Sequence, residues 1–156
     1  MTKKFDKELS KIFLIRPDGK IVIQIRSDNK KLCPNCFDAS AGGLIDQGET
    51  PIQGAMREMH EEIKIKTDLK QIGTSKFYCE PKDWHCKVYV FVGKIDKDIE
   101  WFDKSEVKAI EYFTLSEILA RLALEKKNDN VENVFDTSLV SALESKEIIN
   151  EINRII

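Results

Sequence analysis

The chain has 156 residues, 42% hydrophobic and 33% charged, which suits one ordinary domain with a core and excludes a disordered chain. Its 25 basic and 27 acidic residues give a net charge of −2, which argues against binding to nucleic-acid polymers, since these need a basic surface. With four cysteines, no signal-peptide core and no run near the roughly 20 apolar residues that span a membrane, we expect a cytoplasmic protein with reduced thiols and no membrane association.

The first predicted element is a β-hairpin at residues 11–27, KIFLIRPDGKIVIQIRS. Its two β-rich runs flank Pro17, Asp18 and Gly19, which are typical turn residues. A polar loop, SDNKKLCPNCFDAS, follows the hairpin. A short glycine-containing segment then leads to Gly48.

A helix is predicted after Thr50, which can cap it together with Gln53, while Pro51 fits the first helical position. Apolar residues at helical spacing form one narrow stripe that we expect to be packed: Ile52, Ala55, Met56, Met59 and Ile63. Glu58 and Glu62 are expected along one flank of this stripe, with Glu61 further round the helix.

The rest of the chain predicts strands in KQIGTSKFYCE, HCKVYVFVGKI and KAIEYFT, the second of them central because it is nearly all apolar. Thr114 and Glu117 match a capping box that opens a helix at about residues 115–124. The polar loop KKNDNVEN leads to a last helix at about residues 137–155. This order predicts an α+β domain whose central mixed sheet is covered on both sides.

The segment REMHEEI places three carboxylates, Glu58, Glu61 and Glu62, within seven residues. Like charges at helical spacing repel one another, so the cluster is either a solvated acidic face or a cation site. Mg²⁺ prefers carboxylate oxygens and commonly shares them with substrate phosphates. We therefore expect a divalent cation among these three side chains.

The pattern Gly43, five residues, Glu49, seven residues and then Arg57-Glu58-Met59-His60-Glu61-Glu62 resembles the Nudix box, Gly-x5-Glu-x7-Arg-Glu-U-x-Glu-Glu-x-Gly-U, in which U is a bulky aliphatic residue. The match spans residues 43–65 and departs from the motif only at Lys64, where the family has glycine. The resemblance implies a single Nudix domain over residues 1–156. It also implies the family's α/β/α sandwich, in which the box helix packs against a central mixed sheet.

The resemblance also implies roles for the box residues. Glu58, Glu61 and Glu62 would bind Mg²⁺, or Mn²⁺ in its place, and either Glu61 or Glu62 would activate water. Gly43, Glu49 and Arg57 would support the box, the last two as an ion pair. Lys64 removes no metal ligand, although a positive φ at this position costs a lysine roughly 1 kcal/mol.

The segment before the box resembles the Nudix branch that contains the isopentenyl diphosphate isomerases, in which basic residues contact the substrate's diphosphate. Arg26, Lys30 and Lys31 are the corresponding candidates here. Those isomerases use a cysteine in the run that enters the box and histidine metal ligands, and residues 39–43 contain neither. We therefore expect a Mg²⁺-dependent hydrolase of a nucleoside diphosphate derivative or a nucleoside di- or triphosphate. An isomerase-like enzyme and a non-catalytic nucleotide-binding module are the alternatives.

Further candidates lie outside the box. Glu80 and Glu106 are candidates for a distal carboxylate, and Trp84 and Trp101 for stacking on a nucleobase. We favour free thiols over a zinc site at the four cysteines, Cys33, Cys36, Cys79 and Cys86, because the second pair is spaced loosely for zinc. Whether the chain forms a homodimer is left open by the sequence.

Overall fold

The computed structural model describes residues 5–127 and 134–156. The predicted loop at residues 126–133 lies largely outside this part. In chain order the elements are β1 (Lys7–Ile15), β2 (Ile21–Arg26), β3 (Phe37–Asp38), β4 (Ala41–Leu44), α1 (Pro51–Ile63), β5 (Lys70–Cys79), the 3₁₀ turn η1 (Glu80–Lys82), β6 (Trp84–Lys94), β7 (Val107–Phe113), α2 (Leu115–Lys127), α3 (Thr137–Leu143) and α4 (Lys146–Ile155).

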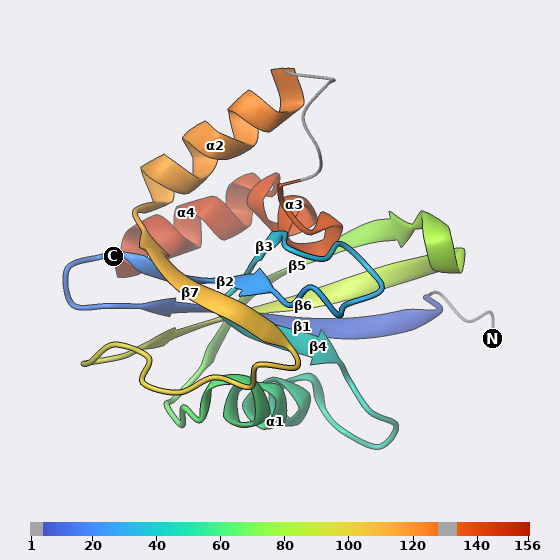
Figure 1. Ribbon diagram of the computed structural model, residues 1–156, viewed down its shortest axis with the longest axis horizontal. Coiled ribbons are helices and arrows are strands. Elements are labelled where there is room, and N and C mark those ends of the chain that lie inside the picture. The colour runs from blue at the N-terminus through green and yellow to red at the C-terminus, as the bar shows by residue number, and fades with distance from the viewer. Residues whose placement is uncertain (1–4, 128–133) are drawn as a thin grey trace.

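The described strands form one mixed sheet in which β1 is central (Figure 1). Strand β1 runs parallel to β6 and antiparallel to β2 and β4, while β5 pairs with β6 and β7 with β2. The predicted hairpin is confirmed, since Ile15 pairs with Ile21 and the turn closes with Gly19 N donating to Arg16 O at 2.9 Å. The prediction of three later strands, with the most apolar of them internal, is also confirmed.

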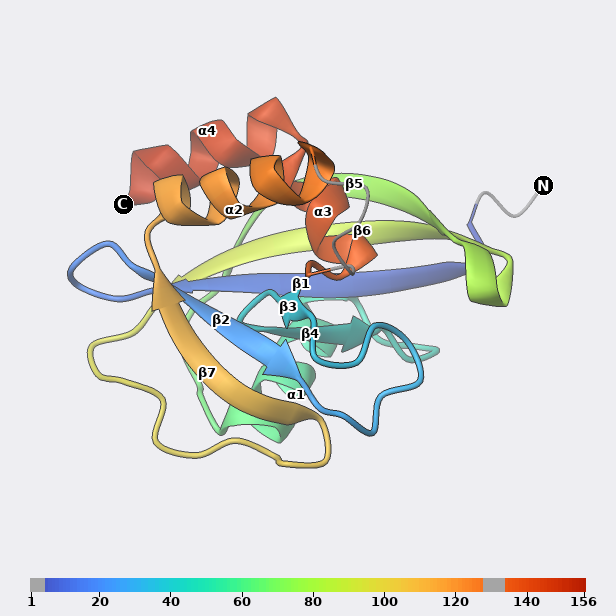
Figure 2. The ribbon, with the colours of Figure 1, turned by 45° about the horizontal axis from the view of Figure 1, so that its top comes forward.

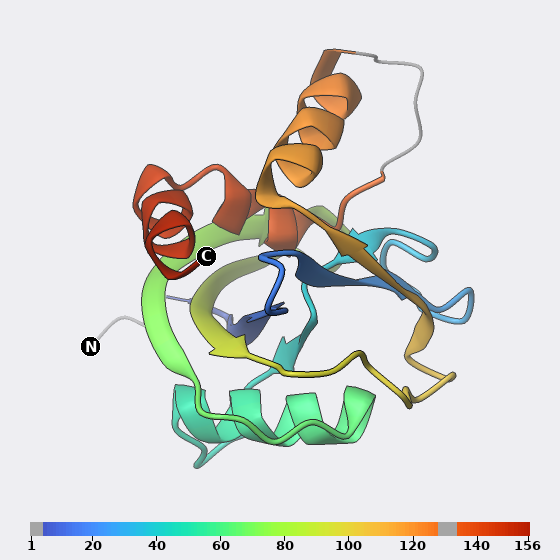
Figure 3. The same cartoon turned by 90° about the vertical axis from the view of Figure 1, so that its left-hand side faces the viewer.

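The sheet lies between two helical layers, with α1 on one face and α2, α3 and α4 on the other (Figures 1 and 3). Alternate residues of β1 point to opposite faces, as the period of a strand requires. Ile12 and Leu14 therefore join the apolar cluster under α1, whereas Phe13 and Ile15 join the cluster under α3 and α4. This is the predicted α+β sandwich.

Helix α1 begins as predicted, with Thr50 and Gln53 forming a capping box and Pro51 at the first position. The predicted apolar stripe is only partly right. Ala55, Met59 and Ile63 are buried against the sheet, but Ile52 and Met56 are 44% and 36% exposed. The packed face is rotated towards Gly54 and Glu62, which are buried. The buried face of α1 thus includes a carboxylate that the pattern placed on the flank of the apolar stripe.

The predicted C-terminal helices are corrected in two respects. The helix that starts at Leu115 extends to Lys127 rather than to about residue 124, and the single helix expected at 137–155 is two helices, α3 and α4. Ser145 separates them, and its hydroxyl accepts from Ile148 N at 3.3 Å to cap α4. The break lets both helices turn their apolar residues towards one core, which contains Leu139 and Ile148.

No helix in the part of the chain that the structure describes has the length and apolar character needed to cross a bilayer.

Lys64 ends α1 in the left-handed conformation, with φ 55° and ψ 35°. Because its Cβ makes this conformation unfavourable, we expect Lys64→Gly to raise the free energy of unfolding by up to about 1 kcal/mol. Urea denaturation measures the change, and Lys64→Ala is the matched control because it keeps the Cβ. Equal stabilities of the Gly and Ala variants would refute the strain at this position.

Candidate active site

Glu62 lies at the buried end of α1, where its side chain faces the sheet. Its Oε1 accepts from Gly42 N at 2.8 Å and its Oε2 from Gln24 Nε2 at 3.3 Å. The residue is only 6% exposed. Burial, aided by the negative charges of Glu58 and Asp38, raises the pKa of Glu62 to about 8. The fold therefore holds one box carboxylate rigidly in a poorly solvated position.

Glu58 is half-buried one helical turn before Glu62. Its carboxylate lies against Gly43, where a Cβ would come within 2.7 Å of Glu58 Cδ and Oε1. Burial raises the pKa of Glu58, the neighbouring Arg57 works against this shift, and the charges of Glu61 and Glu106 add to it. Glycine at position 43 thus makes the space that the Glu58 carboxylate occupies.

Arg57 ties the loop before α1 to the carboxylates of the helix. Its guanidinium donates twice to Glu49, from Nε at 2.8 Å and from Nη2 at 2.9 Å. It also donates from Nη1 to Glu58 at 2.9 Å and to Glu61 at 3.3 Å. The structure therefore forms the ion pair that the motif predicts between Arg57 and Glu49, and this pair is bidentate, the stronger arrangement for arginine and a carboxylate.

Glu61 is more exposed than the other two box carboxylates, with 57% of its side chain accessible. Within residues 5–127 and 134–156, no three His, Cys, Asp or Glu side chains converge as a preformed metal site. Arg57 holds Glu58 and Glu61, while backbone and amide donors hold Glu62. The donor set nevertheless suits a hard cation, because several carboxylates lie close enough together to repel one another. Glu61 and Glu106 both act electrostatically on Glu58, and Glu58 acts on Glu62.

The two candidates for a distal carboxylate lie in different places. Glu106 precedes β7, forms an ion pair with Lys30 and is close enough to Glu58 to act on its pKa. Glu80 lies in η1, at the tip of the β5–β6 hairpin, away from α1 (Figures 1 and 2). The structure thus brings Glu106 to the box carboxylates and leaves Glu80 outside.

The three basic residues before the box are also separated. The Arg26 guanidinium turns inward and donates to the carbonyl of Leu32 at 2.9 Å and to Asp38 at 3.1 Å. Lys30 pairs with Glu106, and Lys31 is exposed. Of these candidates, Arg26 is therefore committed to internal contacts.

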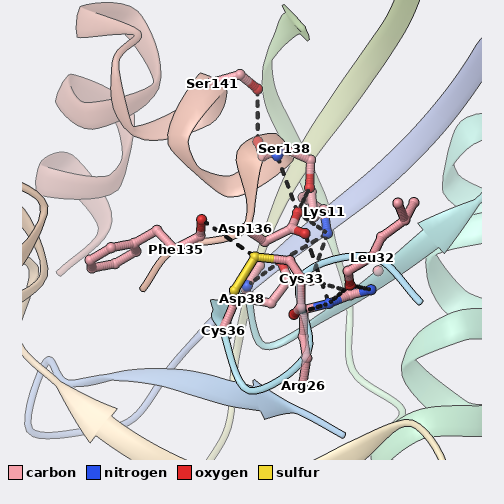
Figure 4. Close-up of polar contacts among 12 residues, drawn as sticks. Lys11, Arg26, Leu32, Cys33, Cys36, Asp38, Phe135, Asp136, Ser138 and Ser141 are labelled. Atoms are coloured by element: carbon pink, nitrogen blue, oxygen red, sulfur yellow. Dashed lines mark hydrogen bonds and ion pairs between the residues drawn. A yellow bond between two sulfur atoms is a disulfide. The ribbon is translucent and has the colours of Figure 1, made fainter. Parts of the chain in front are cut away.

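Two cations and two anions form a buried group that we call the buried ion cluster: Lys11, Arg26, Asp38 and Asp136 (Figure 4). One of its members, Asp38, acts electrostatically on Glu62. Lys11 Nζ is 2.8 Å from Asp38 Oδ1 and 3.8 Å from Asp136 Oδ2. Burial works to lower the pKa of Lys11, but the charges of Asp38 and Asp136 hold it above its ordinary value. The cluster joins β1, β2 and β3 to the residue that caps α3.

The buried ion cluster and Gln24 were missed by sequence reasoning. Lys11 stands inside an apolar strand and so offers one signal, because a lysine on a buried strand face needs an acidic partner. Its partners Asp38 and Asp136 lie far away in the chain, Asp38 by 27 positions and Asp136 by more than that. No local pattern identifies partners at such distances.

The expectation of reduced thiols is wrong for Cys33 and Cys36, which form a disulfide beside the buried ion cluster (Figure 4). Cys79 and Cys86 are free. The two bonded residues are three positions apart in the chain. Arg26 Nε donates a hydrogen bond to the backbone oxygen of Cys33 at 3.2 Å. The disulfide therefore restrains the loop that follows β2.

Reduction of this disulfide should lower stability. A bond that closes so short a loop contributes about 2 kcal/mol through the entropy of the unfolded chain. We expect a dithiol reductant to lower the free energy of unfolding by up to about 2 kcal/mol, measured by urea denaturation with and without the reductant. The double variant Cys33→Ser/Cys36→Ser should show no response to the dithiol, and a wild type equally unresponsive would argue against the bond.

Comparison with known proteins gives matches in sequence and in structure. A family model for the NUDIX domain matches residues 10–135. A Nudix hydrolase of Deinococcus radiodurans is 30% identical over 113 residues, which cover 71% of this chain and 65% of that protein. The chain's matches to three curated relatives span 52%, 55% and 65% of the length of those relatives.

Solved structures share the same arrangement of elements. The MutT protein of Methanosarcina mazei Go1 is 17% identical, has a TM-score of 0.71, and is matched over 96% of this chain and 94% of that one. The dihydroneopterin triphosphate pyrophosphohydrolase of E. coli is 19% identical, has a TM-score of 0.61, and is matched over 80% of this chain and 96% of that one. At such low identities these likenesses establish the fold alone.

Proposed function

The chain belongs to the NUDIX family, and from this premise we propose that it is a metal-dependent hydrolase that cleaves the diphosphate linkage of a nucleotide derivative. The observation that carries the proposal is the group of carboxylates around Glu58. Glu61, Glu62 and Glu106 all interact electrostatically with it, and Gly43 leaves room for its side chain. A divalent cation favours the charged form of carboxyl groups that are crowded in this way.

In this proposal Glu58, Glu61 and Glu62 hold Mg²⁺, or Mn²⁺ in its place, and Glu106 is the distal carboxylate. Such an ion, when bound, lowers the pKa of coordinated water and neutralises charge on the phosphoryl oxygens. Arg57, fixed by Glu49, positions Glu58 and Glu61 for this task. Glu61 or Glu62 accepts the proton of the attacking water.

The surroundings of the box support a substrate that contains phosphate. Lys31 is exposed in the loop before the box and suits contact with a phosphate, whereas Arg26 is paired internally. One structural neighbour is named for hydrolysis of a triphosphate compound, which supports a phosphoanhydride as the bond that is broken. A nucleoside diphosphate derivative or a nucleoside di- or triphosphate is therefore the proposed substrate.

A hydrolysis screen, in which chromatography separates each substrate from its phosphorylated products, tests the proposal. It uses nucleoside di- and triphosphates, dinucleotides, nucleotide sugars, ADP-ribose and isoprenoid diphosphates, each with Mg²⁺ and with excess chelator. We expect hydrolysis of at least one nucleotide and none with chelator. Turnover that persists in chelator would refute the metal-dependent mechanism. Rearrangement of an isoprenoid diphosphate without phosphate release would indicate an isomerase, and nucleotide binding without turnover would indicate a binding module.

Gly43→Ala should impair catalysis while leaving the fold intact. The added Cβ would lie 2.7 Å from the Glu58 carboxylate, which is the end of a flexible side chain and must move aside. We expect kcat/KM to fall by about tenfold or more, because small misplacements of a catalytic group are costly. The free energy of unfolding should change by less than about 1 kcal/mol. Wild-type kcat/KM in this variant would show that the position of Glu58 is unimportant.

A further inference from the structure

The loop at residues 96–106, which joins β6 to β7, is held against the end of α1. Asp103 N donates to Glu62 O at 2.8 Å, and Asp103 Oδ1 accepts from Ser105 N at 3.0 Å. The side chains of Ile99 and Phe102 pack against the apolar cluster under α1. The loop is therefore anchored directly to the residue that the proposed function places at the reacting centre.

Trp101 is the one large aromatic residue that this anchored loop turns outward. Its neighbour Phe102 packs inward, yet Trp101 is 46% exposed. Lys64, two positions after Glu62, places its Nζ 5.0 Å from the centre of the Trp101 ring. An aromatic face and a cation thus lie together at the C-terminal end of α1, the helix that carries the box carboxylates.

The chain's other tryptophan, Trp84, also has lysines near its ring, so the two tryptophans differ mainly in where they lie in the fold. Trp84 has Lys7 Nζ at 5.1 Å and Lys82 Nζ at 5.8 Å from its ring centre. It begins β6 at the tip of the β5–β6 hairpin, away from α1 (Figure 2). Of the two tryptophans, only Trp101 combines an exposed ring and a nearby cation with a place in the loop that Asp103 N joins to α1.

We propose that Trp101, flanked by Lys64, is the platform on which the base of the nucleotide substrate stacks. This inference rests on the proposed function and adds the residue that would distinguish nucleotides from diphosphates without a base. Every nucleobase offers a face for such stacking, so the platform selects for a base and not for one particular base. The Lys64 ammonium adds attraction for the negatively charged nucleotide.

The chain has only two tryptophans. When Trp84 is replaced by phenylalanine, the tryptophan fluorescence therefore comes from Trp101 alone. In Trp84→Phe, α,β-methylene-ADP should change the tryptophan emission in a saturable way, whereas methylenediphosphonate, which has no base, should leave it unchanged. Trp101→Phe, in which Trp84 remains, should respond to neither compound. Equal responses of Trp84→Phe to both compounds would overturn the proposal.

Kinetics provide a second readout. Trp101→Ala should raise KM for nucleotide substrates by about fivefold or more while leaving kcat within about twofold, and Trp101→Phe should restore most of the affinity. If the wild type hydrolyses nucleotides and Trp101→Ala has the same KM, the platform is refuted and the proposed function stands. If no nucleotide is bound or hydrolysed by the wild type, both are refuted.

Discussion

Glu62→Gln should reduce kcat by about 10²–10⁴-fold with little loss of stability. Glutamine has almost the shape of glutamate and can accept the hydrogen bond from Gly42 N through its carbonyl oxygen. The burial that raises the pKa of Glu62 to about 8 also favours a neutral side chain at this position. The amide, however, has no charge to offer a cation and cannot accept a proton from water. The effect should therefore fall on catalysis.

The measurement is kcat at saturating Mg²⁺ and substrate, together with the urea midpoint of each protein. Glu147→Gln is the matched control, because Glu147 is an exposed carboxylate on α4, across the sheet from α1. The control should keep wild-type kcat. A Glu62→Gln enzyme within tenfold of the wild type would exclude Glu62 from the chemistry.

Local sequence signals predicted the elements that local interactions define. The capping box of Thr50 and Gln53 involves residues three positions apart, and so does that of Thr114 and Glu117. The hairpin turn closes between Arg16 and Gly19. Because each of these contacts lies within a few residues, the amino-acid order alone identified them.

Long-range contacts decided what the sequence left unpredicted. The apolar pattern of α1 favoured burial of Ile52 and Met56, yet Glu62 is buried because Gly42 and Gln24 supply hydrogen bonds from two strands. These donors lie 20 and 38 positions away from Glu62 in the chain. These hydrogen bonds allow a carboxylate to be buried where the helical pattern alone predicts burial of other, apolar residues.

The residues of the candidate site show the same difference between local and long-range signals. The box spacing identified Glu58, Glu61 and Glu62 because all three lie on one helix. Glu106 was one of two candidates for the distal carboxylate, and only the fold separates it from Glu80 by bringing it near Glu58. The network behind the site, including Asp38, has no sequence motif of its own.

Lys11→Met should destabilise the protein by about 3 kcal/mol, the lower end of what is lost when one partner of a buried ion pair is removed. Lys11 is fully enclosed, and methionine would fill most of its volume but leave Asp38 and Asp136 with a single cation, Arg26. The buried ion cluster would then carry a net negative charge that water cannot solvate. Arg26 remains 3.1 Å from Asp38, which is why we expect the lower end of the range.

Urea denaturation at neutral pH measures this loss, which should also lower Tm by roughly 6–12 °C in a domain of this size. The double variant Lys11→Met/Asp38→Asn restores electrical neutrality, because Arg26 then balances Asp136. We expect it to be more stable than Lys11→Met by at least about 1 kcal/mol, although it has one more substitution. A double variant less stable than the single one would show that the charge balance of the cluster is not what stabilises this part of the core.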